Sequence, residues 1–143
     1  MKGPIQSVEA TWLVHATEDP KKVESALSRT LETQTPPDFE RLEGHFGNEI
    51  QRARLHLTGD EADGAFRSLV SRLAPGARKD VTIDISKYLD EHSALFLRFD
   101  KQSLVAGTLV LGSADSVRVK VKPRGYMVKG GAPRFFADLL GEG

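Results

Sequence analysis

An alternation of apolar with polar residues, repeated in three separate segments, restricts the fold of this chain more than any other feature. The segments are residues 8–15, 52–57 and 117–122. Successive side chains of a β-strand point to opposite faces of a sheet, so each segment predicts a strand with one buried and one exposed face. A sheet built from such strands is covered on one face only, because its other face carries polar side chains.

Other stretches repeat apolar residues at helical spacing. We expect helices over residues 20–32, from Gly59-Asp60 to Pro75-Gly76, over 80–89, and from Pro133. Asp19 offers an N-cap oxygen to the first helix, and Pro20 stands where no amide donor is needed. Residues 80–89 also fit a strand, and we favour the helix. Further strands are expected over 38–43, 94–99 and 108–111.

This order of elements predicts a single α+β domain over residues 1–143. The expected architecture has two layers, an antiparallel or mixed sheet with helices on one face. A chain of 143 residues is of ordinary one-domain size. It contains no cysteine and no apolar run near the roughly 18 residues of a membrane span, and it begins with polar residues. We therefore expect a cytoplasmic protein without disulfides.

Charge is distributed unevenly along the chain although its formal net charge is zero. Residues 1–96 hold 12 basic and 16 acidic residues, whereas residues 97–134 hold 8 basic and 2 acidic ones. A basic segment on an otherwise neutral body indicates a site for a polyanion. The alternative is a solvated edge whose charges are balanced by neighbours in the fold.

The uncovered face of the predicted sheet collects most of these cations. By the alternation it carries Leu13 and Phe96 among basic and imidazole side chains: His15, Arg52, Arg54, His56, Arg98, Arg118, Lys120 and Lys122. Arg118, Lys120 and Lys122 would stand about 6.5–7 Å apart on one strand, a spacing comparable to that of adjacent phosphates. Such a row could follow a nucleic-acid backbone. Lysines that protect an edge strand from aggregation would give the same pattern.

The segment Gly44-His45-Phe46-Gly47-Asn48 predicts an exposed turn between two strands. His45 and Phe46 could stack on an unpaired base there. In the alternative, Phe46 folds back onto the core.

Histidines near carboxylates raise the question of catalysis. His15 lies near Glu18 and Asp19, and His45 near Glu43, but no metal-ligand spacing or nucleophile elbow occurs. We therefore expect no enzyme, and neither a metal nor an organic cofactor.

Four segments in order resemble one family: His15-Ala16-Thr17-Glu18-Asp19, Leu42 to Asn48, Leu97-Arg98-Phe99-Asp100-Lys101-Gln102, and Arg118 to Lys122. Over about residues 7–122 the chain is similar to archaeal RNA-binding domain proteins described as predicted exosome subunits. The resemblance implies a two-layer α/β fold like that of the ribosomal protein that binds 5S RNA. It also implies RNA binding without a known reaction, with exosome or ribosome-related proteins as candidate partners. It does not extend to residues 123–143.

The combined interpretation is a non-catalytic RNA-binding protein linked to RNA processing or degradation. Its expected RNA contacts are Arg118, Lys120 and Lys122, extended by Arg98 and Lys101, with His45, Phe46 and Asn48 contacting bases or fixing their loop. The alternative function is a protein–protein module or homodimer, which would use Leu13 and Phe96 on the uncovered face.

Overall fold

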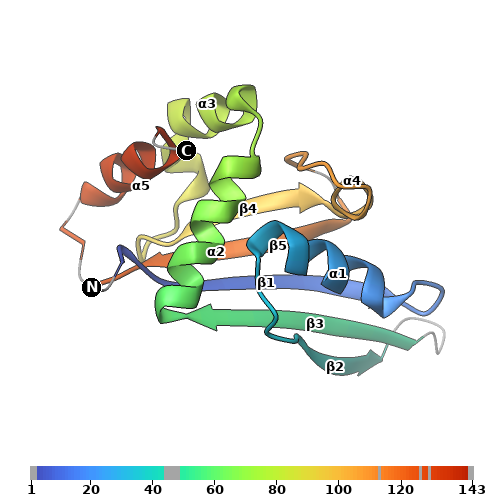
Figure 1. The fold of residues 1–143 in the computed structure, drawn as a ribbon. Helices are drawn as coiled ribbons and strands as arrows, with labels where there is room; N and C mark the ends of the chain where they lie inside the picture. The colour runs from blue at the N-terminus through green and yellow to red at the C-terminus, as the bar shows by residue number, and fades with distance from the viewer. Residues whose placement is uncertain (1–2, 44–48, 113, 126, 129, 142–143) are drawn as a thin grey trace.

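The computed structural model describes residues 3–43, 49–112, 114–125, 127–128 and 130–141. Its elements in chain order are β1 (Ile5–His15), α1 (Pro20–Leu31), β2 (Asp38–Glu43), β3 (Glu49–Thr58), α2 (Gly59–Arg72), α3 (Pro75–Ile83), the 3₁₀ helix η2 (Ile85–Tyr88), β4 (Leu95–Asp100), α4 (Lys101–Val105), β5 (Ser116–Pro123) and α5 (Gly131–Gly141). The strands form one sheet in the order β2-β3-β1-β5-β4, with all neighbours antiparallel (Figure 1). The predicted α+β class is confirmed.

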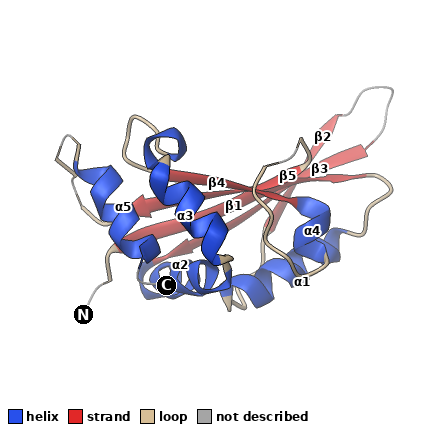
Figure 2. Cartoon of the chain, turned by 90° about the horizontal axis from the view of Figure 1, so that it is seen from above, coloured by secondary structure: helices blue, strands red, loops and turns tan. Residues whose placement is uncertain are grey.

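The sheet and the helices form two layers. Figure 1 shows α1 and α2 crossing in front of the strands, and Figure 2 shows both helices on the same side of the sheet from above. The apolar positions of β1, β3 and β5 are buried, as the alternation predicted. Within the described ranges, no helix is long and apolar enough to cross a membrane.

Helices α1 and α2 begin and pack as their sequences indicate. The Asp19 carboxylate accepts a hydrogen bond from the Lys21 amide at 2.9 Å, which satisfies one free amide at the start of α1. In α2, the hydroxyl of Ser68 donates to the carbonyl oxygen of Thr30 at 2.7 Å. This buried hydrogen bond joins the two helices that cover the sheet.

Most of the ambiguous segment 80–89 is helical, as we favoured, although Leu89 forms an isolated bridge with Leu95. It belongs to α3 and η2, in which Val81 and Ile85 are buried while Ile83 is 67% exposed. A strand would have placed all three on one face, so the burial pattern decides between the two periodicities. Pro75 occupies the first turn of α3, where a proline needs no amide partner. It therefore starts a new helix after α2 has already ended at Arg72.

The prediction of a strand over 108–111 was wrong. After β4 the chain forms the short helix α4, because the Asp100 carboxylate accepts from the Ser103 amide at 2.9 Å and caps it. Residues 108–111 then lie beside the end of β4, where Leu111 forms an isolated bridge with Phe99. The sheet accordingly ends at β4 rather than at a sixth strand.

Helix α5 returns the end of the chain to the helical layer. It begins at Gly131, two residues before the predicted Pro133. Phe136 is fully buried and meets Phe66 of α2 edge to face, with ring centroids 6.3 Å apart. The residues after β5 therefore contribute to the core as well as to the surface.

Candidate functional site

The uncovered face of the sheet is organised in rows that cross the strands. Strand register places Asp38, Arg54, Thr11, Arg118 and Arg98 in one row. The adjacent row holds His56, Glu9, Lys120 and Phe96. The basic residues predicted for this face are thus brought together on it.

Carboxylates neutralise the cations at the β3 side of this face. Arg54 Nη2 lies 2.7 Å from Glu9 Oε2, and Arg52 Nη1 lies 3.5 Å from Glu40 Oε2. Partial burial would raise the pKa of Glu9, but the Arg54 hydrogen bond and the charges of Arg54, His56 and Lys120 lower it below 4.5. Glu9 therefore stays ionised and cancels much of the positive charge around β3.

The β4–β5 side of the same face is different. Arg98, Arg118, Lys120 and Lys122, here called the basic cluster, form no ion pair with any other described residue. The charge of Lys120 helps to lower the pKa of Glu9, but the Glu9 carboxylate already accepts a hydrogen bond from Arg54. The positive charge of the basic cluster is therefore largely uncompensated by the residues that the structure describes.

An aromatic ring lies within the basic cluster. The guanidinium carbon of Arg118 is 4.7 Å from the centroid of the Phe96 ring, and Lys120 Nζ is 5.4 Å from it. Both distances are within cation–π range. Phe96 is partly exposed, and both cations lie over its ring, so a base would stack on Phe96 in the place of one of them.

A shallow hollow of about 380 Å³ lies over Thr11 at the centre of the face. Its lining comprises Glu9, Thr11, Trp12, Leu13, Arg52, Arg98, Ser116 and Arg118. Leu13 is 40% exposed and gives the hollow an apolar part. Basic, hydroxyl and apolar groups are thus available at one place on the sheet.

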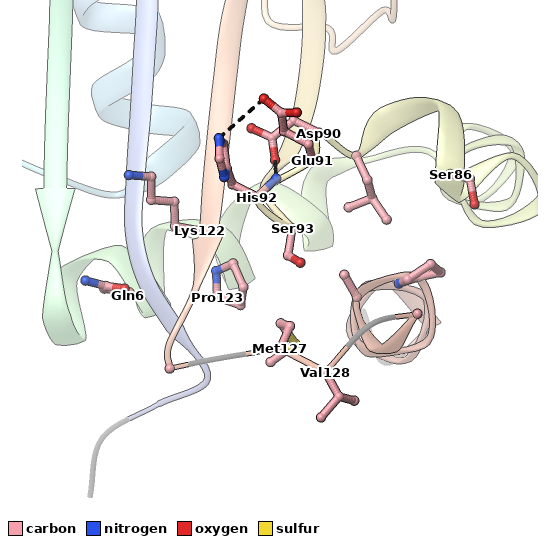
Figure 3. Close-up of a pocket in the computed structure, with 15 residues that line it drawn as sticks. Gln6, Ser86, Asp90, Glu91, His92, Ser93, Lys122, Pro123, Met127 and Val128 are labelled. Atoms are coloured by element: carbon pink, nitrogen blue, oxygen red, sulfur yellow. Dashed lines mark hydrogen bonds and ion pairs between the residues drawn. The ribbon is translucent and has the colours of Figure 1, made fainter.

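A larger hollow, of about 740 Å³, lies where β5 ends. Figure 3 shows Lys122 and Pro123 on one side of it, Asp90 to Ser93 on another, and Met127 and Val128 opposite. Asp90 and Glu91 place carboxylates here, which disfavour a phosphate. A row of phosphate contacts along β5 would therefore end at Lys122.

Lys101 does not extend the basic cluster, contrary to the prediction. Its side chain is 1% exposed, and Nζ donates to the carbonyl oxygen of Leu13 at 2.9 Å and to Glu18 Oε1 at 2.8 Å. Asp115 Oδ1 is 3.0 Å from the same ammonium. Leu95, Leu97 and Phe99 are the buried residues of β4, and Lys101 follows them in the same alternation. Its ammonium joins the end of β1 to the residue before β5.

This buried ammonium also brings two of the resemblance segments together in space. Glu18 belongs to residues 15–19 and Lys101 to residues 97–102, and they meet in one ion pair. His15 lies at the edge of the group, with Nε2 3.9 Å from Glu18 and 4.0 Å from Asp115. The group holds the fold together, and its carboxylates already have a cation.

Acid should weaken the fold through Glu18. Partial burial raises the pKa of this carboxyl, but hydrogen bonds from Lys101 and from the His15 amide, with the Lys101 charge, bring it below 4.5. A lowered pKa stabilises the folded state above the unfolded value, and this contribution is lost as pH falls through the folded pKa. We expect the free energy of unfolding to drop below pH 4.5, and less steeply in Glu18→Gln. Denaturant unfolding between pH 3 and 6 measures this; parallel curves would contradict it.

His45, Phe46 and Asn48 lie outside the described residues. Their predicted contacts with bases stay predictions.

Comparison with protein families gives a match over most of the chain. A family described as RNA binding matches residues 7–123. A Pyrococcus abyssi protein named as an RNA-binding protein is 28% identical over 138 residues, which cover 90% of each chain. The family match contains β2 to β5 and all of β1 except its first two residues.

Solved structures of archaeal proteins have the same fold. A protein of Archaeoglobus fulgidus from a family of unknown function superposes with a TM-score of 0.80 and 25% identity, covering 94% of this chain and 99% of its own. A protein of that family from Methanothermobacter thermautotrophicus gives a TM-score of 0.77 and 26% identity, covering 96% and 99%. The resemblance stated from the sequence motifs is confirmed.

Proposed function

The chain belongs to the RNA-binding family matched over residues 7–123, and from this premise we propose that it binds RNA on the uncovered face of its sheet. The observation that carries the proposal is the asymmetry of that face. The cations of β3 are paired with Glu9 and Glu40, whereas the basic cluster of β4 and β5 has no ion-pair partner among the described residues. RNA phosphates would supply the missing negative charge.

Phosphate contacts would provide most of the affinity. Each phosphate that a lysine or arginine neutralises releases condensed counterions, which favours binding and makes it salt-dependent. Such contacts position an RNA without reading its sequence. Phe96 adds a surface on which one unpaired base can stack, and every base has a face suited to it. We therefore propose single-stranded RNA as the ligand, with modest sequence preference.

Binding to unrelated RNAs tests this proposal directly. Fluorescence anisotropy should give dissociation constants within about threefold for single-stranded 12-mers of different sequence, because phosphate contacts dominate. A perfect duplex should bind more weakly, since its bases cannot reach Phe96. One sequence preferred a hundredfold, or a duplex bound more tightly, would contradict the proposal.

A non-catalytic role is part of the same proposal. The two carboxylates nearest to His15 belong to Glu18 and Asp115. Both are paired with Lys101 and so are poorly placed to act as general bases. We expect RNA to remain intact after incubation with the protein, with or without divalent metal ions, on denaturing gels. Cleavage that disappears in His15→Ala or His45→Ala would make the protein a nuclease.

The motif resemblance extends the proposal to RNA processing or degradation. Exosome or ribosome-related proteins would then be partners, and affinity purification from the native cell with mass spectrometry tests this. A protein-docking or homodimeric face is the second candidate function, favoured by the 40% exposure of Leu13. Light scattering with wild type and Leu13→Ser distinguishes it, because a dimer through this face would dissociate in the variant.

A further inference from the structure

Two arginines of the basic cluster stand directly opposite each other on neighbouring strands. The register of β4 and β5 pairs Arg98 with Arg118. Like charges at directly opposed positions of an antiparallel pair repel each other and destabilise it. In the described ranges no carboxylate forms an ion pair with either arginine, so this repulsion is not relieved by an acid of that part of the fold.

Further groups around this pair suit an anion. Arg98 and Arg118 both line the hollow over Thr11, together with the hydroxyl residues Thr11 and Ser116. Arg118 is held on the face by its contact with the Phe96 ring at 4.7 Å. Glu9 also lines the hollow, but Arg54 engages its carboxylate at 2.7 Å.

The size of the hollow limits what can occupy it. About 380 Å³ lies at the lower end of the range for small-molecule sites, more than a phosphate group alone requires. Arginine can hold a phosphate through two parallel hydrogen bonds, and two arginines from different strands could approach it from two sides. Leu13 would leave an apolar part of the hollow for the attached sugar.

We propose that the hollow over Thr11 holds one phosphate group of the bound RNA, clamped between Arg98 and Arg118. This inference rests on the proposed function and adds to it a fixed point in the path of the strand. The strand would run along β5 past Lys122 and Lys120 and then cross towards β4 at the clamp. Lys120 and Lys122, the other cations of the basic cluster, would each contact one phosphate.

Inorganic phosphate tests the clamp without RNA. We expect phosphate at about 50 mM to raise the melting temperature of the wild type by about 3 °C over chloride of equal ionic strength, if its dissociation constant is about 10 mM. Arg98→Gln and Arg118→Gln should lose most of this shift and should melt no lower than wild type in chloride, because each removes a repulsion. Lys122→Gln is the matched control. It removes a cation of the same face that does not line the hollow, and its shift should equal that of the wild type.

Parallel RNA titrations separate the clamp from the proposed function. The clamp would be overturned if phosphate raised the melting temperatures of Arg98→Gln, Lys122→Gln and wild type equally. It would also be overturned if phosphate did not raise that of the wild type, even if RNA still binds. A phosphate shift confined to proteins with both arginines, without RNA binding by the wild type, would keep the anion site and refute the proposed function. With both correct, Arg98→Gln should weaken RNA binding about tenfold at 0.15 M salt, against about fourfold for Lys122→Gln as a single phosphate contact.

Discussion

Replacing Arg118, Lys120 and Lys122 together with glutamine is expected to weaken RNA binding at least 50-fold, as an order of magnitude, at about 0.15 M salt. Each phosphate contact to single-stranded RNA contributes about 0.7 to the slope of log affinity against log salt. Three contacts therefore lower the slope by about 2, which gives this loss at 0.15 M. The loss should be the same for unrelated RNA sequences. Anisotropy titrations between 0.05 and 0.4 M salt measure both the affinity and the slope.

Folding should survive the triple substitution because the three side chains are on the uncovered face. Val117, Val119 and Val121, which alternate with them, are buried and unchanged. The matched control is Lys21, Lys22 and Arg29 changed together to glutamine. These three side chains are exposed on α1, in the helical layer, and their replacement removes three positive charges, as the triple substitution on β5 does. If the control lowers affinity and slope equally, the protein binds RNA diffusely and the basic cluster is no site.

Replacing Lys101 with methionine is expected to lower the free energy of unfolding by about 3 kcal/mol. Removing one partner of a buried ion pair costs about 3–5 kcal/mol. The lower end applies because Glu18 and Asp115 have side-chain exposures of 25% and 48% and can be partly rehydrated. Methionine keeps the length of the side chain but removes the ammonium that donates to the Leu13 carbonyl and to Glu18, which keeps only the hydrogen bond from the His15 amide. The melting temperature should fall by roughly 10 °C.

Lys87→Met provides the comparison for this loss. Lys87 is 78% exposed and lies 4.0 Å from Asp84, so its replacement should change stability by less than about 0.5 kcal/mol. Below its melting temperature, Lys101→Met should bind RNA within about twofold of the wild type. Normal stability with impaired RNA binding would show that Lys101 belongs to the RNA site after all.

The positions of β1, β3 and β5 and the identity of the uncovered face could be predicted from alternation alone. A period of two assigns each side chain to a face without knowledge of which strands are neighbours. It therefore placed Arg52, Arg54, Arg98 and Arg118 on one surface correctly. Register, which depends on the whole chain, was needed to show that Glu9 lies beside Arg54 while Arg98 faces Arg118. The difference between neutralised and uncompensated cations was for this reason not visible in the sequence.

The error over Lys101 has a local cause. The sequence from residue 97 to 102 reads as a strand followed by a polar turn, and a lysine in a turn is normally solvated. The alternation that buries Leu95, Leu97 and Phe99 also assigns Lys101 to the covered side, where it meets Glu18 and Asp115, and the Asp100 cap starts α4 at this point. A cap of this kind, an aspartate three residues before Ser103, was the signal available at the sequence level.

Mapping bound RNA onto the backbone of the wild-type protein tests the location of the site most directly. In a titration with a single-stranded 12-mer, we expect the largest amide chemical-shift changes in β4 and β5, at Phe96, Arg98, Arg118 and Lys120. Amides of β2 and of the exposed side of α1 should change little. Largest changes on the helical layer, or changes spread evenly over both layers, would contradict an RNA site on the uncovered face of the sheet.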